Sequence, residues 1–378
     1  MWYGDTLSAG RIGWQSFQET AAMAGNVTQL YNKKIVVAMS GGVDSAVTAA
    51  LLKEAGAEVC GVFMRLAQPD VRHREEEARA VADHLGIPLM VEDLHEEFAR
   101  QVLNYFAAHY CAGSTPNPCV ICNRSIKCGS LLARVVPRYG ELLATGHYAR
   151  IEPDDSGVYR LRQGVDQKKD QSYFLCRLDQ PRLRQMLFPL GGVTKESVYG
   201  MAAHLGIAGR HGKESQDVCF LKEQSVAAFL EEHYPVPGGG PIITRQGEVL
   251  GRHQGLHHYT VGQRRGLGLP DATPFYVTGF DAPRNAVIVG KSADLLHCAL
   301  IVAEVHWLGG VAPPLPRRFQ VKIRYRHLAA PALVEEATPG TIRLRFDEPQ
   351  RAATPGQFAV LYDGEEVAGS GVIVSAEA

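Results

Sequence analysis

The chain has 378 residues, 46% of them hydrophobic and 21% charged, and its formal net charge at pH 7 is −1. This composition is typical of a soluble globular protein, and the length allows two or three domains. No apolar run reaches the ~18 residues that a membrane span needs, and the near-neutral balance confines any nucleic-acid-binding surface to a local patch. We therefore expect a cytoplasmic protein with no membrane partner.

Residues 1–32 form the first segment. They lack the apolar core of a signal peptide, so we interpret them as a poorly ordered N-terminal extension. The first patterned element follows, because an apolar run over residues 35–39 predicts a strand buried on both faces of a parallel sheet. Apolar residues at helical spacing from Val43 to Leu51 predict a helix.

The stretch between this strand and helix, residues 40–45, reads SGGVDS. Glycines let a backbone approach a phosphate closely, and the free N–H groups of a helix N-terminus face an anion. Ser40 and Ser45 add hydroxyl donors, and Asp44 can bind Mg²⁺ on the phosphates. A Walker A loop needs Lys-Ser or Lys-Thr after its glycines, which this stretch lacks. It resembles instead the PP-loop of the ATP pyrophosphatases, which cleave ATP to AMP and pyrophosphate while adenylating a substrate.

Strands alternate with helices through the rest of residues 33–217. We expect strands over residues 58–64, 89–91 and 142–146, and helices over residues 74–85 and 98–110. This alternation predicts an α/β domain with a doubly wound parallel sheet. Ligands bind such sheets at the carboxyl ends of the strands, where Met64 and Gly146 stand. Core packing is an equally good interpretation of Met64.

The chain has eight cysteines, and a disulfide framework is not expected in a cytosolic protein of this size. Cys119 and Cys122 form a Cys-x-x-Cys pair in a proline-containing loop that leads into a new helix. The helix N-terminus and the nearby Arg124 and Lys127 would lower the pKa of the Cys122 thiol and favour a reactive thiolate. A zinc half-site is the alternative, although no second Cys-x-x-Cys pair completes it.

Further segments lead into a second domain. Residues 168–175 place two lysines and an amide before an apolar run, a pattern that also suits a solvated turn. Residues 213–220 introduce another cysteine, Cys219. We place a small central domain at residues 218–296. Within it, basic residues interleaved with Tyr and Gly over residues 257–267 suit contact with an RNA backbone, although a surface hairpin would look similar.

Short alternating strands punctuated by Gly and Pro fill residues 297–378 and predict a C-terminal β-barrel. We expect strands over residues 321–325, 341–346, 358–362 and 367–374. Arg324 and Tyr325 would then lie on a barrel strand, within the basic cluster of residues 317–327. This cluster is the local positive patch that an RNA could contact.

Together these stretches resemble the tRNA-specific 2-thiouridylase family, from about Lys33 to Val374. The matching motifs, in the family's order, are AMSGGVDS, TPNPxxxCN, ATGHYAR, KDQSYFL, a Cys-Phe segment, YTVGQRRGLG, RYR and PGQ. The resemblance implies a PP-loop domain, a small central domain and a C-terminal β-barrel. It also implies a sulfurtransferase that uses ATP and Mg²⁺ to adenylate the C2 oxygen of the wobble uridine (position 34) in the anticodon loop of tRNA. A cysteine persulfide, loaded by a sulfur-donor protein, would then deliver sulfur and give 2-thiouridine and AMP.

The resemblance assigns roles only at matching positions. Cys219 matches the persulfide-bearing cysteine and Cys122 the other catalytic cysteine, which implies a reversible disulfide between them when no donor is present. The positions that match the ATP site are Ala38, Met39, Ser40, Gly41, Gly42, Val43, Asp44, Ser45, Met64 and Gly146. The positions that match tRNA-binding residues are Asn117, Pro118, Cys119, His147, Lys169, Asp170, Gln171, Arg324, Tyr325 and Gln357.

The chain departs from the family at two places. Cys119 stands where many members carry Asp, and the segment Arg65–Arg72 is shorter than in many members. Cys119, Cys122 and Cys219 could together ligate a [4Fe–4S] cluster that leaves one iron open, with zinc as a further metal of similar ligand preference. A spectator role for Cys119 is the simpler interpretation, because a persulfide route needs only two thiols.

Two other functions stay open on the sequence. One is a PP-loop synthetase of the GMP, NAD or argininosuccinate type, which would not explain Cys122 together with Cys219. The other is a nucleotide-gated RNA-binding protein that binds ATP without turning it over. Pyrophosphate release that depends on added tRNA would separate these readings.

Overall fold

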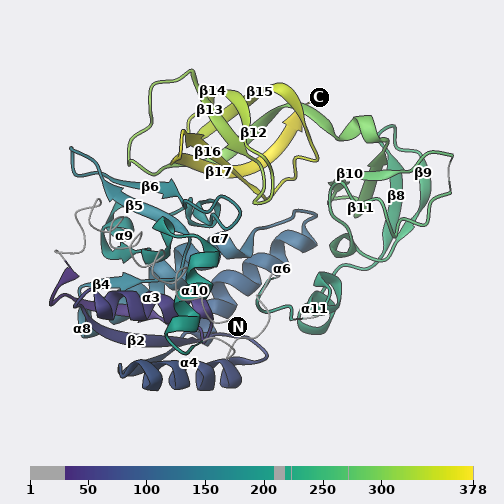
Figure 1. The fold of residues 1–378 in the computed structure, drawn as a ribbon. Helices are drawn as coiled ribbons and strands as arrows, with labels where there is room; N and C mark the ends of the chain where they lie inside the picture. Colours follow the sequence, from purple (N-terminus) through teal and green to yellow (C-terminus); the bar gives the residue numbers. More distant parts are fainter. Residues whose placement is uncertain (1–29, 208–217, 223, 271, 378) are drawn as a thin grey trace, which may run out of the picture.

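The computed structural model describes residues 30–207, 218–222, 224–270 and 272–377. Within these ranges the chain forms an α/β domain, a β-barrel above it and a smaller domain to one side (Figure 1). None of the helices described there is long and apolar enough to cross a membrane. The predicted N-terminal extension, residues 1–32, lies almost wholly outside the described residues.

The α/β domain contains a five-stranded parallel sheet in the order β3-β2-β1-β4-β7. Its strands are β1 (Lys34–Ala38), β2 (Glu58–Arg65), β3 (Leu89–Asp93), β4 (Leu142–Ala144) and β7 (Met186–Leu187). Ile35 and Val37 of β1 enter one hydrophobic core, whereas Val36 enters another. Because successive side chains of a strand point to opposite faces, both faces of the sheet are covered. The predicted doubly wound sheet is confirmed.

Helices supply the cover on each face. On one face lie α3 (Val43–Glu54) and α4 (Val71–Leu85), and α10 (Lys195–His204) packs on α3. The other face carries two helical runs, of which the first is α5 (His95–Phe98), η1 (Ala99–Leu103) and α6 (Asn104–Cys111), and the second is α7 (Pro118–Cys122), η2 (Asn123–Leu131) and α8 (Leu132–Tyr139). Both η1 and η2 are π-helical. Such turns are rare and often mark functional sites, and η2 directly follows Cys122.

A hairpin that the sequence analysis missed joins this domain to the barrel. It consists of β5 (Ala149–Pro153) and β6 (Tyr159–Gln163), and β6 pairs with the barrel strand β17 (Glu366–Glu377). Arg160 adds an ion pair to Glu366 at 3.0 Å. The remaining short elements of the α/β domain are η3 (Ser172–Leu175), α9 (Gln180–Gln185) and η4 (Pro189–Gly192).

The central domain follows α11 (Val226–His233) and contains a four-stranded sheet in the order β10-β11-β8-β9. Its strands are β8 (Gly240–Thr244), β9 (Val249–His253), β10 (Tyr276–Asp281) and β11 (Ala286–Gly290). Residues 257–267 form no hairpin: they follow the start of η5 (Leu256–His258) and continue in turns. Tyr259 and Leu267 pack in the domain's own core, which holds this segment against the sheet.

The C-terminal domain is a closed barrel of six strands in the order β12-β15-β14-β13-β16-β17, in which β12 also pairs with β17. After η6 (Ser292–Leu295), the strands are β12 (Leu296–Trp307), β13 (Arg317–Lys322), β14 (Ala330–Thr338), β15 (Thr341–Arg351), β16 (Phe358–Asp363) and β17. The predicted barrel is confirmed, but one detail of it is wrong. Because β13 ends at Lys322, Arg324 and Tyr325 lie in the turn beyond it. There Tyr325 stacks on Phe174 of the α/β domain, with ring centroids 4.3 Å apart.

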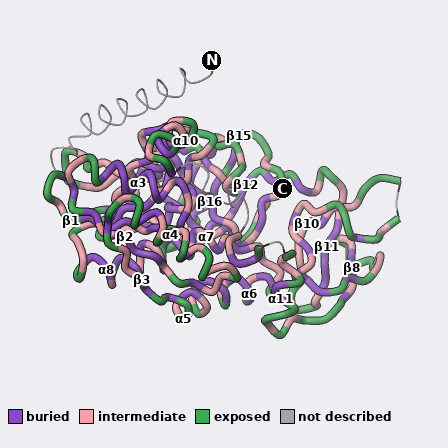
Figure 2. Tube along the Cα trace, turned by 60° about the horizontal axis from the view of Figure 1, so that its bottom comes forward, coloured by how far each residue is buried: buried purple, intermediate pink, exposed green. Residues whose placement is uncertain are grey.

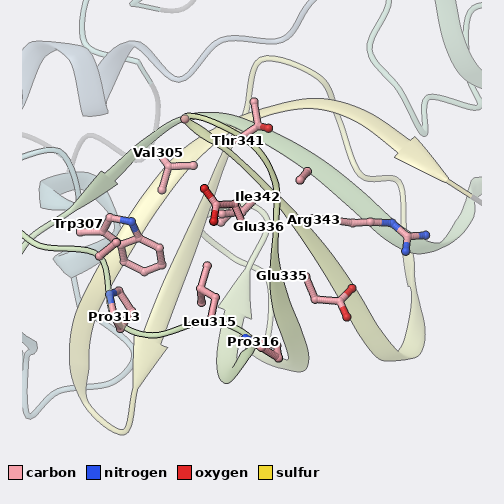
Figure 3. A pocket seen from close by; sticks show the side chains of 13 residues that line it. Val305, Trp307, Pro313, Leu315, Pro316, Glu335, Glu336, Thr341, Ile342 and Arg343 are labelled. Carbon is pink, nitrogen blue, oxygen red and sulfur yellow. The ribbon is translucent and has the colours of Figure 1, made fainter.

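Buried residues are concentrated around β1, β2 and α3 (Figure 2). An open pocket of about 690 Å³ lies instead on the barrel, where Trp307, Leu315 and Arg343 are among its lining residues (Figure 3). None of the residues predicted to act on ATP, sulfur or tRNA lines this pocket.

Candidate active site

Hydrogen bonds among its own residues order the PP-loop. The Ser40 N–H donates to Ser45 Oγ at 3.2 Å, and Ser45 Oγ donates to the Gly42 carbonyl at 2.9 Å. These bonds fold the loop over the N-terminus of α3, where the first backbone N–H groups have no partner inside the helix. The serine hydroxyls thus shape the loop, and binding of an anion by the N–H groups of the first helical turn stays a prediction.

A side chain at either of two glycines of this site would have to displace its neighbours. Gly41 has a φ of +79°, in the left-handed region, and a Cβ there would lie 2.8 Å from Cβ of Glu77. Gly146 follows β4, and a Cβ there would stand 2.9 Å from Asp44 Cβ and 3.1 Å from Ser45 N. Gly146 is therefore in direct contact with the PP-loop.

The two methionines assigned to the nucleotide differ in their surroundings. Met39 is 1% exposed and its sulfur packs against Gly61 in the core, so only its backbone borders the loop. Met64 is half-buried near the end of β2 and contacts the core of the opposite face of the sheet. The contact of Met64 with the core is observed, whereas its contact with the nucleotide stays a prediction.

Asp44 is engaged by two residues that the sequence analysis missed. Lys195 Nζ donates to both carboxylate oxygens, at 2.7 and 2.9 Å, and the Tyr148 hydroxyl donates to Oδ1 at 2.7 Å. Lys195 lies 151 positions from Asp44, so no local spacing could reveal the pair. Tyr148 stands inside the ATGHYAR motif, but nothing in that motif indicates its partner.

Cys119 and Cys122 lie on α7. Asn117 caps this helix by accepting a hydrogen bond from the Val120 N–H at 3.3 Å, and a proline fills the first helical position. Residues three apart share a helical face, so both thiols point to one side. Because hydrogen bonds in a π-helix span five residues, η2 brings Lys127 one turn beyond Cys122 on that side.

Cys219 joins these thiols from a distant segment. Its neighbour Phe220 is 3% exposed and packs edge-on against Phe106, with ring centroids 5.1 Å apart, in the core that also contains Cys122. The charge of a Cys219 thiolate raises the pKa of both Cys119 and Cys122, so the three sulfur atoms are close enough to interact. All eight cysteines are free thiols in this structure, and residues 213–217 of the predicted segment lie outside the described ranges.

The pKa prediction for Cys122 is wrong in direction. Burial raises the pKa of the Cys122 thiol to about 12, and the charge of Lys127 offsets only part of this rise. Burial likewise raises the pKa of Cys119 to about 11. The loss of thiolate hydration outweighs the neighbouring cation, a balance that depends on burial and that residue spacing cannot show.

The turn after β4 connects the PP-loop with the thiols. Gly146 touches the PP-loop, and the next residue, His147, has a pKa held well below its usual value by burial and by the charge of Lys127. Burial lowers the pKa of Lys127 itself, but the four surrounding thiols raise it overall. This turn therefore lies against the PP-loop at Gly146 and within reach of the charge of the half-buried Lys127 at His147.

The barrel reaches the loop that carries Asn117. Gln357 donates from Nε2 to the Thr115 carbonyl at 3.0 Å, and the Thr115 N–H donates to the Pro355 carbonyl at 3.0 Å. Gln357 thus positions the segment that leads into Cys119. The sequence analysis grouped Gln357 with the tRNA-binding residues and could not show this contact.

The residues assigned to tRNA differ in exposure. Arg324 is exposed, whereas Pro118, His147 and Asp170 are buried. The half-buried members are Asn117, Cys119, Lys169, Gln171, Tyr325 and Gln357. Asp170 is 3% exposed and accepts the Ser172 N–H at 3.1 Å, so its side chain holds the loop around it. Contact of these residues with tRNA stays a prediction.

One compact group of possible metal ligands occurs within the described ranges: Glu231, His257 and His258, whose ligand atoms lie within 4.8 Å of one another. The Nε2 atoms of both histidines contact Glu231 Oε1, at 3.2 and 2.9 Å, so hydrogen bonds satisfy the group without a metal. The buried Nδ1 of His257 also lacks the outer partner that a metal-bound imidazole almost always has. Among the described residues, Cys119, Cys122 and Cys219 do not form an equally compact group.

Comparisons with known proteins cover nearly the whole chain. Family models match in series: a tRNA methyl transferase HUP domain over residues 33–223, a tRNA methyl transferase PRC-barrel domain over residues 227–291, and an aminomethyltransferase beta-barrel domain over residues 297–373. The tRNA-specific 2-thiouridylase MnmA of Desulfotalea psychrophila is 45% identical over 339 residues, which cover 89% of this chain and 98% of that protein. The chain belongs to the tRNA-specific 2-thiouridylase family. A second family member, from Geobacter metallireducens, is 43% identical and covers 93% of this chain and 99% of that protein.

Among solved structures, the U34-tRNA thiolase NcsA from Methanococcus maripaludis, with its [4Fe–4S] cluster, matches at a TM-score of 0.38 and 20% identity. The match covers 58% of this chain and 74% of that chain. A similarity of this size carries no argument about the chemistry of the 2-thiouridylase family member described here.

Proposed function

We propose that this protein uses ATP to replace the C2 oxygen of the wobble uridine, position 34, of tRNA with sulfur. The observation that carries the proposal is the turn at residues 146–147, in which Gly146 lies against the PP-loop and His147 is close enough to Lys127 for the charge of that lysine to lower its pKa. Membership of the 2-thiouridylase family supports the same activity. A site that activates an oxygen with ATP also needs a nearby nucleophile to displace the activated group. In this proposal the PP-loop binds the ATP and a thiol supplies the nucleophile.

In the first step the uridine C2 oxygen attacks the α-phosphorus of ATP. A new P–O bond forms, the bond to pyrophosphate breaks, and the N3 proton of the base is lost. Backbone N–H groups at the start of α3 bind the phosphates, and Asp44 would hold Mg²⁺ on them. Adenylation turns a poor leaving group into AMP. The wobble base is unpaired in its loop, so bringing it into a pocket costs little.

In the second step the terminal sulfur of a Cys219 persulfide attacks C2, and AMP leaves with the former uridine oxygen. The Cys122 sulfur then attacks Cys219 Sγ, which breaks the S–S bond and releases the thiolated base, whose anion takes up the proton that Cys122 loses. The transferred sulfur is reduced and the two thiols are oxidised to a disulfide. A dithiol reductant and a persulfide donor protein restore the starting state.

The tRNA would approach from the side where the barrel meets the α/β domain. We propose direct contact through Arg324, Tyr325 and Lys169, because their side chains are exposed or half-exposed there. Buried His147 and Asp170 would act by holding their loops in place. The segment from Asn117 to Cys119 would meet the target base beside the thiols.

A [4Fe–4S] cluster on Cys119, Cys122 and Cys219 is the competing route to sulfur transfer. The persulfide route is preferred, because it uses only the two thiols that the family motifs supply. Iron and sulfide analysis of anaerobically purified protein decides between them. Colourless, iron-free protein that fully thiolates tRNA would exclude the cluster, whereas loss of both colour and activity in Cys119→Asp would favour it.

The decisive experiment measures ATP–pyrophosphate exchange and the nucleosides of tRNA in the same reactions. Purified protein is incubated with Mg²⁺, ATP and a persulfide donor, with and without tRNA. We expect exchange only when tRNA is present, and 2-thiouridine by mass spectrometry. Exchange that depends on a small metabolite instead of tRNA would identify a synthetase, and ATP binding without any exchange would identify a nucleotide-gated RNA-binding protein.

A further inference from the structure

Contacts at its backbone fix the position of Lys195. Its N–H donates to Asp166 Oδ2 at 3.0 Å, and Thr194 caps α10 by accepting the Ser197 N–H at 3.2 Å. Apolar side chains of α10 and α3 share one buried cluster. The first turn of α10 therefore stands beside the first turn of α3, where Asp44 lies.

The side chain of Lys195 is nearly enclosed. It is 8% exposed, and its ammonium lies 5.7 Å from the centre of the Tyr148 ring and 4.9 Å from that of Tyr199. It bonds both oxygens of Asp44, whose side chain is 33% exposed. An ammonium near the N-termini of two helices opposes both helix dipoles. The Asp44 carboxylate offsets this effect when no ligand is bound, and an anionic ligand would offset it in the same way.

The contacts of Asp44 conflict with its expected role as a magnesium ligand. Lys195 donates to both carboxylate oxygens, and its positive charge opposes the binding of Mg²⁺ to the same carboxylate. An unneutralised Asp44 would also repel the phosphates that the PP-loop attracts. The loop lacks the lysine that a Walker A loop supplies to its phosphates.

We propose that Lys195 is this missing phosphate-binding lysine. It neutralises Asp44 before nucleotide binds and moves its ammonium to the β- and γ-phosphates of ATP, which leaves Asp44 free to bind Mg²⁺. A lysine binds phosphate as a point charge on a flexible four-carbon stem, so the exchange needs no movement of α10. This inference rests on the proposed function, because it takes ATP as the ligand of the PP-loop.

The test compares three ligands that differ in their phosphates. Binding of Mg²⁺–ATP, pyrophosphate and AMP is measured by calorimetry without tRNA, for the wild type, Lys195→Met and Lys195→Arg. We expect Lys195→Met to weaken ATP and pyrophosphate at least about tenfold, as for loss of a charged hydrogen bond, and to leave AMP nearly unchanged. Lys195→Arg, which keeps the charge, should retain most of the affinity for pyrophosphate.

The matched control is Lys34→Met, the same change at an exposed lysine at the other end of β1, which should affect none of the three ligands. Unchanged pyrophosphate binding by Lys195→Met would overturn the inference. Equal weakening of AMP and pyrophosphate would also overturn it, since Lys195 would then only shape the loop. Should the Met variant fail to fold, Lys195→Gln against Lys195→Arg carries the same comparison. Failure of the wild type to bind ATP would refute the proposed function as well. A loss of binding that occurs only in the variants leaves the proposed function intact.

Discussion

The contact between Gly146 and the PP-loop makes Gly146→Ala a sharp test of the proposed nucleotide site. A Cβ at this position would lie 2.9 Å from Asp44 Cβ, 3.0 Å from Asp44 C and 3.1 Å from Ser45 N. Ordinary contacts begin at 3.4 Å, so the closest one must lengthen from 2.9 to at least 3.4 Å. Two of the three atoms are backbone atoms of the loop, which cannot rotate away. The added methyl must therefore displace the PP-loop itself.

Overpacking of this kind costs about 1–3 kcal/mol, which corresponds to about a 5- to 150-fold loss of ATP affinity if the cost falls on the nucleotide-binding conformation. Calorimetric titration with Mg²⁺–ATP measures the loss, and thermal unfolding shows how much of the cost falls on the fold instead. Gly238→Ala is the matched control, because a Cβ there has no heavy atom within 4 Å. If Gly146→Ala bound ATP and unfolded like the wild type, the reasoning about the loop would be refuted.

Four further predictions concern the thiols and the tRNA surface. Cys219→Ser should keep tRNA-dependent ATP–pyrophosphate exchange but form no 2-thiouridine, and any 2-thiouridine from this variant would show that another residue carries the sulfur. Burial raises the pKa of Cys122 to about 12, above the ~8.5 of a free thiol. The thiol should therefore be protonated at neutral pH. Its rate of alkylation, followed by peptide mass spectrometry, should rise about tenfold per pH unit from pH 7 to 10. An alkylation rate that does not change with pH would contradict the burial argument. Because the pKa of Cys122 is higher in the folded than in the unfolded state, its contribution to the free energy of unfolding is complete below about pH 8.5 and is lost as the pH rises toward 12. Unfolding measurements at pH 7 and 10 can check this loss. Arg324→Ala should weaken tRNA binding and lower its salt dependence by about one unit of slope, and lost turnover at unchanged tRNA affinity would argue instead for a role in chemistry.

The sequence determined the features that local chemistry dictates. A small-residue turn between an apolar strand and a helix can be recognised from residues 35–51 alone, because backbone freedom and side-chain periodicity are local properties. The same holds for the doubly wound sheet and the barrel, whose strands follow from alternation and punctuation. The order of the motifs was enough to identify the family.

Tertiary structure decided everything that depends on burial or on distant partners. Lys195 reaches Asp44 across 151 positions, and only the packing of α10 on α3 makes that pair. β13 ends at Lys322, and beyond it Tyr325 packs on Phe174 of another domain, a contact that no alternation pattern contains. The direction of the Cys122 pKa shift was mispredicted, because spacing shows a nearby cation but not the loss of water around the sulfur. Charge and periodicity can be recognised from neighbouring residues of a sequence, whereas desolvation and long-range contacts exist only once the chain has folded.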